Sequence, residues 1–116
     1  MHELSLAQGV VRRTLVAAQE AKAKAVRRIF LRIGELAGVD GRQLTSAFEV
    51  VRGGTICDGA VLDIEFVAAS WSCPTCAVAI ESGAALRCPT CGTAAQLAKD
   101  ADALSILRIE LEVDGV

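Results

Sequence analysis

Aromatic residues and histidine are scarce in this sequence of 116 residues. Aromatic side chains make up 3%, tyrosine is absent, and the single histidine is His2. Because hydrophobic residues still reach 53%, we expect an aliphatic core. With its only histidine at the N-terminus, the chain offers no Ser/His/Asp or Cys/His catalytic arrangement. We therefore predict that the protein is not an enzyme.

Long apolar runs and an excess of positive charge are also missing. No hydrophobic stretch approaches the roughly 20 residues of a membrane helix, and the first residues, Met1 to Leu4, have no basic or apolar signal region. The 12 basic and 14 acidic residues are interspersed, which is unlike a nucleic-acid-binding surface. A GxxxxGK[ST] nucleotide loop does not occur. We expect a cytoplasmic chain with neither a membrane nor a nucleic-acid partner.

Four of the five cysteines lie in a near-repeat, Cys73-Pro74-Thr75-Cys76 and Cys88-Pro89-Thr90-Cys91. Each half places two thiols two residues apart across a tight turn, so that both sulfurs can face one ion. Two such knuckles complete the tetrahedron of thiolates that structural zinc prefers. Four cysteines leave no open position for water, so this pattern predicts a closed zinc site that stabilises the fold.

Other interpretations of the four cysteines remain: rubredoxin-like iron, a disulfide pair, or a CxxC redox motif. A reducing cytoplasm favours metal over disulfide. Cys57 lies away from the knuckles, and we expect it to be a buried or half-buried free thiol rather than a fifth ligand.

Hydrophobic periodicity predicts two helices. Apolar residues recur every three or four positions from Leu4 to about Lys22, which is typical of an amphipathic helix. Ser5 and Gln8 could form its capping box, with His2 just before it. The second helix carries its apolar residues Leu44, Phe48 and Val51 on one face, with Asp40 as the expected N-cap and Gly53-Gly54 as its end.

Alternating apolar and charged residues predict three strands, at Val26–Ile33, Val61–Val67 and Leu107–Val113. Glu35 falls in the loop after the first strand, where we expect a solvated side chain. The economical fold is α+β, a three-stranded sheet covered by two helices, with an inserted zinc-ribbon-like four-cysteine module. We expect one domain from residues 1–69 plus 99–116 and a zinc-binding domain from residues 70–98, which is too small to fold without metal.

The N-terminus is a second candidate metal site. Met1 should be retained in front of His2, so its α-amine, the backbone nitrogen and imidazole of His2, and the amide nitrogen of Glu3 can form fused chelate rings. Four nitrogens in a plane suit Ni(II) or Cu(II) rather than zinc.

Several segments together resemble a known family. They are Met1–Ala7, Ile33–Val39, Ala47–Val51 followed by Gly54-Thr55, the paired CxxC motifs and the Leu107–Val113 run. In this order, and over essentially the whole chain, they resemble the hydrogenase nickel-incorporation protein family, HypA/HybF.

This resemblance implies a nickel metallochaperone that delivers Ni(II) during maturation of [NiFe]-hydrogenase, and in some organisms of urease. It implies as partners a nickel-handling maturation GTPase and the hydrogenase large-subunit precursor, with the chain as a monomer or weak homodimer. By resemblance, His2 supplies the side-chain nickel ligand, Glu3 its backbone nitrogen, and Asp40 an acid near the nickel.

By the same resemblance, the four cysteines Cys73, Cys76, Cys88 and Cys91 hold structural Zn(II). This chain has no histidine beside its knuckles, which argues against exchange of zinc ligands from cysteine to histidine. Ala77 follows the first knuckle where many ribbons have glycine, so we expect some backbone strain there. Two alternatives remain at this point: a zinc-ribbon module that binds nucleic acid or protein, and an iron-containing electron-transfer protein.

Overall fold

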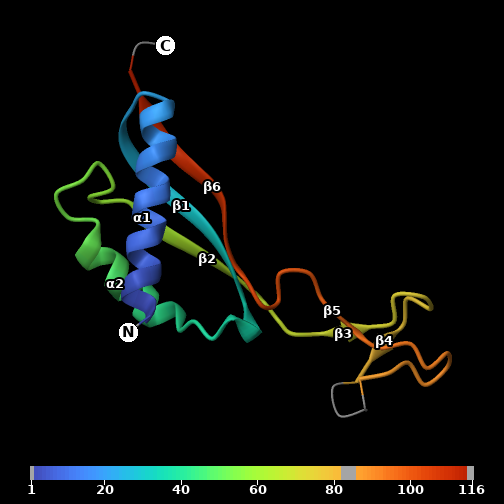
Figure 1. Ribbon diagram of the computed structural model, residues 1–116. Helices are drawn as coiled ribbons and strands as arrows, with labels where there is room; N and C mark the ends of the chain where they lie inside the picture. Colours follow the sequence, from blue (N-terminus) through green and yellow to red (C-terminus); the bar gives the residue numbers. More distant parts are fainter. Residues whose placement is uncertain (1, 82–85, 115–116) are drawn as a thin grey trace.

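The computed structural model describes residues 2–81 and 86–114 and contains two separate three-stranded sheets. In chain order the elements are α1 (His2–Glu20), β1 (Ala23–Gly34), a 3-10 turn η1 (Glu35–Ala37), α2 (Gly41–Val51), β2 (Val61–Val67), β3 (Trp71–Ser72), β4 (Ala79–Ile80), β5 (Gln96–Leu97) and β6 (Leu104–Val113). The molecule is elongated, 58 × 34 × 16 Å (Figure 1). Within the described ranges, no helix meets the length and apolarity that crossing a bilayer requires.

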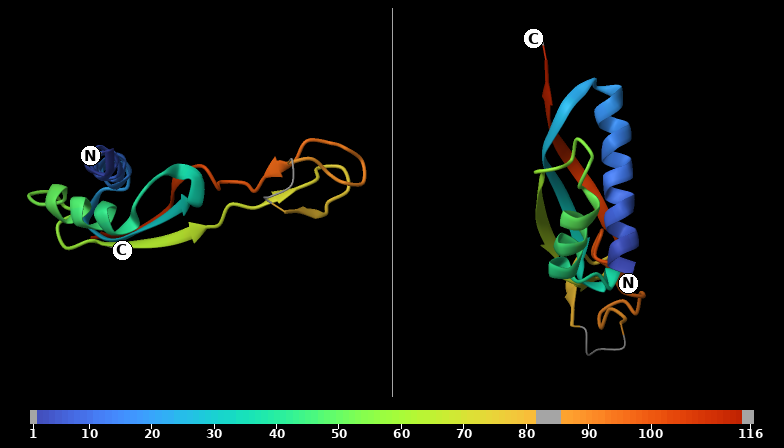
Figure 2. Two further views of the ribbon diagram at one scale, coloured as in Figure 1. Left: turned by 90° about the horizontal axis from the view of Figure 1, so that it is seen from below. Right: turned by 90° about the vertical axis from the view of Figure 1, so that its left-hand side faces the viewer.

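The larger sheet has the order β2-β1-β6, with β1 parallel to β2 and antiparallel to β6. Both helices lie on one face of it (Figure 2). Along β1 the residues Ile29, Leu31 and Ile33 turn toward the helices and are buried, whereas Arg28 and Arg32 lie on the opposite face and pair with acids of β2. The α+β fold predicted from the sequence is confirmed. We call residues 2–67 and 104–114 the larger module.

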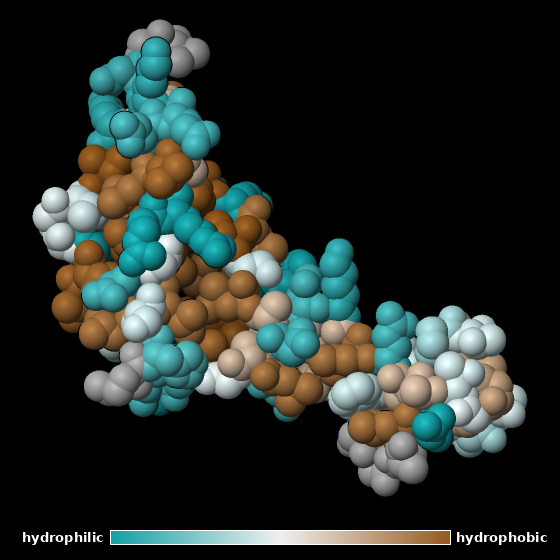
Figure 3. Space-filling view, in the orientation of Figure 1, coloured by the Kyte–Doolittle hydropathy of each residue, from teal (hydrophilic) through white to brown (hydrophobic). Residues whose placement is uncertain are grey.

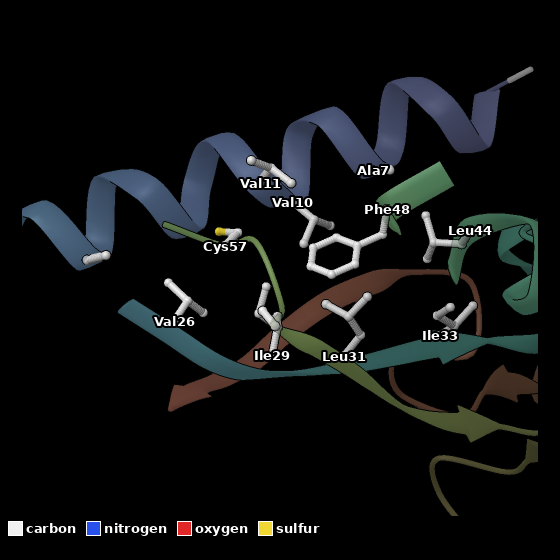
Figure 4. Close-up of a cluster of buried hydrophobic side chains, with 12 residues drawn as sticks. Ala7, Val10, Val11, Val26, Ile29, Leu31, Ile33, Leu44, Phe48 and Cys57 are labelled. Atoms are coloured by element: carbon white, nitrogen blue, oxygen red, sulfur yellow. The ribbon is translucent and has the colours of Figure 1, made fainter. Parts of the chain in front are cut away.

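Mainly aliphatic side chains from α1, α2, β1 and the loop before β2 form the core of the larger module (Figure 4). Val10 of α1, Leu44 and Phe48 of α2, and the inward residues of β1 face one another and are almost fully buried. Cys57 is also buried and free, as predicted, and burial raises the pKa of its thiol. Burying these apolar surfaces contributes about 25 cal/mol per Å², and it holds this module together.

The start of α1 differs from the prediction. The helix already includes His2, so the proposed capping box of Ser5 and Gln8 is wrong, and His2 lies in the first turn rather than before it. The reason lies outside the helix: Glu3 is buried and its carboxylate accepts the backbone N–H of Asp40. A long-range contact thus stabilises the first turn, which local patterns do not reveal.

Strand boundaries also extend beyond the prediction. β1 begins at Ala23 and β6 at Leu104, because the first residues of β6 continue the antiparallel pairing as far as Ile33. The predicted N-cap of α2 is confirmed: Asp40 accepts hydrogen bonds from the backbone nitrogens of Arg42 and Gln43. Past the end of α2, Gly54 has a φ of 75°, which glycine adopts without strain.

Two chain segments connect the larger module to the smaller sheet, β4-β3-β5, and we call them the neck (residues 68–70 and 98–103). Ala98 donates to the carbonyl of Ser70 at 2.8 Å, so the two segments run together. Gly34 lies against Ala101 so closely that any side chain at this position would collide with the backbone of Ala101. Glu35, exposed as expected, also accepts a hydrogen bond from Ala69 at 2.7 Å. The neck is therefore fixed to the end of β1.

Candidate metal centres

The four cysteines of the two knuckles come together at the far end of the smaller sheet. The sulfur atoms of Cys73, Cys76, Cys88 and Cys91 all lie within 4.8 Å of one another, and Cys73 and Cys91 are 3.5 Å apart. All four are free thiols, since a disulfide would require about 2.05 Å. A tetrahedron with Zn–S bonds of roughly 2.3 Å has sulfur atoms about 3.8 Å apart. The donor set and its spacing therefore fit a closed four-thiolate metal site.

The two knuckles have the same backbone geometry. In the first, Ala77 donates to the carbonyl of Cys73 at 2.8 Å, and in the second, Gly92 donates to the carbonyl of Cys88 at 2.8 Å. Ala77 has a φ of 59° and Gly92 a φ of 74°. This left-handed conformation is unfavourable for alanine, so the strain predicted at Ala77 is present.

Hydrogen bonds give Cys76, Cys88 and Cys91 unequal pKa values in the metal-free chain. The Thr93 hydroxyl, 3.0 Å from the Cys91 sulfur, and the Thr93 backbone lower the pKa of Cys91 to about 6. Backbone N–H groups of Cys91 and Thr90 lower the pKa of Cys88. The neighbouring sulfurs of Cys91 and Cys73 raise the pKa of Cys76 to about 12. Cys88 and Cys91 therefore form thiolates more readily than Cys76, from which metal binding must displace a proton.

The N-terminal candidate site lies at the first turn of α1, beside the start of α2. The side chain of His2 is 57% exposed, and its Nδ1 atom is 3.8 Å from Oε1 of Glu3. Hydrogen bonds from the backbone N–H of Asp40 and from its own N–H lower the pKa of the Glu3 carboxyl group. Met1 lies outside the described residues. The structure thus brings His2, Glu3 and the backbone of Asp40 together.

The side chain of Asp40 already has a structural role. One of its carboxylate oxygens accepts from Arg42 at 2.9 Å and from Gln43 at 3.1 Å, which caps α2. Since its backbone N–H also binds Glu3 at 3.1 Å, Asp40 joins the starts of the two helices. The sequence predicted the cap, but not the link to Glu3, because the two residues are far apart in the chain.

One feature near His2 was missed by sequence reasoning. A groove of about 440 Å³ runs between α1 and β6, and it includes His2, Gly9, Arg12, Arg13 and Asp102 in its lining. The sequence signal for this groove was Gly9. Glycine within a helix costs about 1 kcal/mol of helix stability relative to alanine, so its presence there called for an explanation.

Comparison with protein families gives a match over residues 1–111 to the model described as hydrogenase/urease nickel incorporation, metallochaperone, HypA. A hydrogenase maturation factor HypA from Dehalococcoides mccartyi is 40% identical over 83 residues, covering 72% of this chain and 70% of the relative. One from Synechococcus elongatus is 45% identical over 76 residues, covering 66% and 68%.

Two solved structures have the same fold. The solution structure of the nickel metallochaperone HypA from Helicobacter pylori has a TM-score of 0.69 and 22% identity, covering 97% of this chain and 98% of that one. A second solution structure, of a HypA protein, has a TM-score of 0.75 and 24% identity, covering 98% of each chain. At these identities the structural likeness supports the fold alone.

Proposed function

The chain belongs to the HypA family of hydrogenase and urease nickel-incorporation proteins, and we propose that it binds one Ni(II) at its N-terminus and releases it to a client. It is a nickel metallochaperone of hydrogenase maturation. The observation that carries the proposed site is the exposed His2 in the first turn of α1, beside Glu3 and Asp40. Neither nucleic-acid binding nor iron-based electron transfer is favoured by the family match.

The proposed nickel ligands are the α-amine of Met1, the backbone nitrogen and imidazole of His2, and the backbone nitrogen of Glu3. The first amides of a helix have no acceptor within the helix, so ligation costs α1 no helical hydrogen bond. The N–H of Glu3 donates to its own carboxylate, and nickel at that nitrogen replaces this bond. The backbone N–H of Asp40 binds the Glu3 carboxylate and would hold it away from a nickel ion at the Glu3 nitrogen.

We propose that Zn(II) occupies the four-cysteine site and has a structural role. Four thiolates in a tetrahedral set suit zinc and leave no position for a substrate. Elemental analysis of the purified protein should give about one zinc per chain. Iron in its place would contradict the assignment.

The proposed partners are a nickel-handling GTPase and the hydrogenase large-subunit precursor, in the cytoplasm, with urease as a second proposed client in organisms that make it. Transfer proceeds by ligand exchange and needs no catalytic residue in this chain. The exposed side chain of His2 suits this exchange, because an incoming ligand can reach a metal bound there.

Equilibrium dialysis against Ni(II) tests the N-terminal site. We expect His2→Ala to lose binding, and one extra residue before Met1 to weaken or alter it, because the terminal amine moves out of the chelate. Gln8→Ala, an exposed change on the same helix, is the matched control and should bind as the parent does. The protein must begin at Met1 without a tag. Unchanged affinity in both altered proteins would refute the site.

A further inference from the structure

The groove between α1 and β6 results from the way the helices sit on the sheet. α1 and α2 pack against each other above the central strand, so Leu31 and Ile33 of β1 are fully buried. On β6 the equivalent inward residues Leu104 and Ile106 stay only partly buried, and they form an apolar floor with Val10. Figure 3 shows apolar surface around α1 on the larger module, interspersed with hydrophilic side chains.

Two arginines at the rim of this groove have no ion-pair partner within residues 2–81 and 86–114: Arg12 and Arg13. The arginines of the sheet differ, since Arg27, Arg28 and Arg32 each pair with a carboxylate. Both rim guanidinium groups are exposed beside the groove. Asp102 also lines the groove, but among the described residues it forms no ion pair with either arginine, so two cations face one acid there. A carboxylate entering the groove would meet this excess of positive charge.

Gly9 has no use in the packing of the protein itself. A methyl group built on this residue would meet nothing within 4 Å, so no neighbour requires glycine there. Alanine would favour the helix by about 1 kcal/mol. Glycine does, however, keep the wall of the groove low at its middle, where an incoming chain would pass.

The edge of β6 is protected against strand addition in only one of its halves. Among the described residues β6 pairs with β1 alone. Its second half carries Arg108, Glu110 and Glu112, and charges on an edge strand discourage pairing with another chain. The first half, Leu104–Leu107, has no charge, and Leu107 is 42% exposed. This uncharged half borders the groove.

We propose that the groove is a docking site for an extended, carboxylate-bearing segment of a nickel-handling partner protein. The segment adds as a fourth strand beside Leu104–Leu107, places an apolar side chain on the groove floor, and sets an acidic side chain against Arg12 and Arg13. Strand addition of this kind takes affinity from backbone hydrogen bonds and specificity from side-chain pockets. The proposal rests on the proposed function for the identity of the partner.

The length of the groove favours a peptide segment over a small anion. His2 and Arg13 lie at its two ends on the same helix, about 16 Å apart at 1.5 Å per residue. An extended chain covers this distance in about five residues. Such a segment brings its partner to the exposed imidazole of His2, where nickel is proposed to bind.

The test uses the full-length chain and, as probes, the maturation GTPase and the hydrogenase large-subunit precursor of the same organism. Affinity is measured for three variants: Arg12→Gln with Arg13→Gln, Gly9→Leu, and Leu107→Lys. We expect each to bind at least one probe about tenfold more weakly, with the salt dependence reduced in the arginine variant. Amide NMR shifts on binding should fall on residues 104–107 and along α1.

The controls separate docking from folding and from nickel binding. Arg42→Gln removes an exposed arginine in the first turn of α2 and should bind like the parent. Gly9→Ala and Gly9→Leu should both raise the unfolding temperature, so weaker docking by the leucine variant cannot come from misfolding. His2→Ala should lose nickel but still dock. Parent-like docking by the arginine and Gly9→Leu variants, or NMR shifts outside the groove, would overturn the proposal. If His2→Ala keeps its nickel affinity while the docking results are as expected, the proposed nickel site fails and the docking site stands.

Discussion

The two modules of this chain are stabilised by different means. In the larger module, twelve buried residues from α1, α2, β1 and the loop before β2 form a continuous aliphatic core. In the four-cysteine module the buried cluster is Cys73, Ile80 and Cys88, and the sheet consists of two-residue strands. So small an apolar cluster cannot offset the entropy of ordering the chain. Side-chain burial therefore stabilises the larger module, and we expect a metal bound by the four cysteines to stabilise the smaller one.

Removing the metal should reveal the difference in stability between the two modules most clearly. Structural zinc contributes about 10 to 16 kcal/mol to small metal-folded units, so we expect residues 70–98 to lose order in chelated protein while the larger module stays folded. Amide hydrogen exchange measures the protection of both modules in one sample. Protection of the knuckle amides that survives metal removal would show that burial alone holds the smaller module.

Leu31→Ala should produce the opposite result. This side chain is fully buried on β1, and its truncation should cost the larger module about 2 to 5 kcal/mol. Urea denaturation, followed by the amide signals of each module, should show a lower midpoint for the larger module only. The zinc content of the folded variant should not change. Loss of zinc together with the core would mean that the two modules unfold as one.

Asp40→Ala should destabilise the larger module by about 1 kcal/mol through loss of the α2 cap. Asp40→Asn keeps an acceptor oxygen and should keep most of the stability. Comparing the two by urea denaturation and nickel dialysis separates the cap from any part in nickel binding. If the asparagine variant is stable but binds nickel less well, the carboxylate has a role at the metal. If both variants are as stable as the parent, the cap has no energetic importance.

The smallest expected effect concerns the knuckle turns. Ala77→Gly should stabilise the metal-bound module by about 0.5 to 1 kcal/mol, because the gain from relieving left-handed alanine exceeds the entropy cost of glycine. Gly92→Ala, at the matching position, should have the opposite sign. Competition for zinc against a chelator measures both. Equal zinc retention in the two variants would mean that the turns adjust when the metal binds.

The sequence predicts the parts of this protein whose signals are local. Strand alternation identifies the inward residues of β1, Asp40 is recognisable as a cap, and the CxxC spacing identifies the four-cysteine site. Three features could not be predicted: the first turn of α1, the attachment of the neck to Gly34, and the groove. Each depends on residues that are distant in the chain, such as Glu3 with Asp40 or Gly34 with Ala101. Periodicity contains no information about such contacts.

The position of β6 has a consequence for how the chain is made. β6 is the last strand in the sequence, and it is joined to β2 through the whole four-cysteine module. During synthesis the pair β1 and β2 can form early, while the other edge of β1 stays unpaired until the C-terminal residues have been made. A folded module between β2 and β6 shortens the flexible loop that must close, and this lowers the entropy cost of closure. Zinc bound during translation should therefore speed completion of the sheet, and a cell short of zinc would accumulate chains with an open β1 edge.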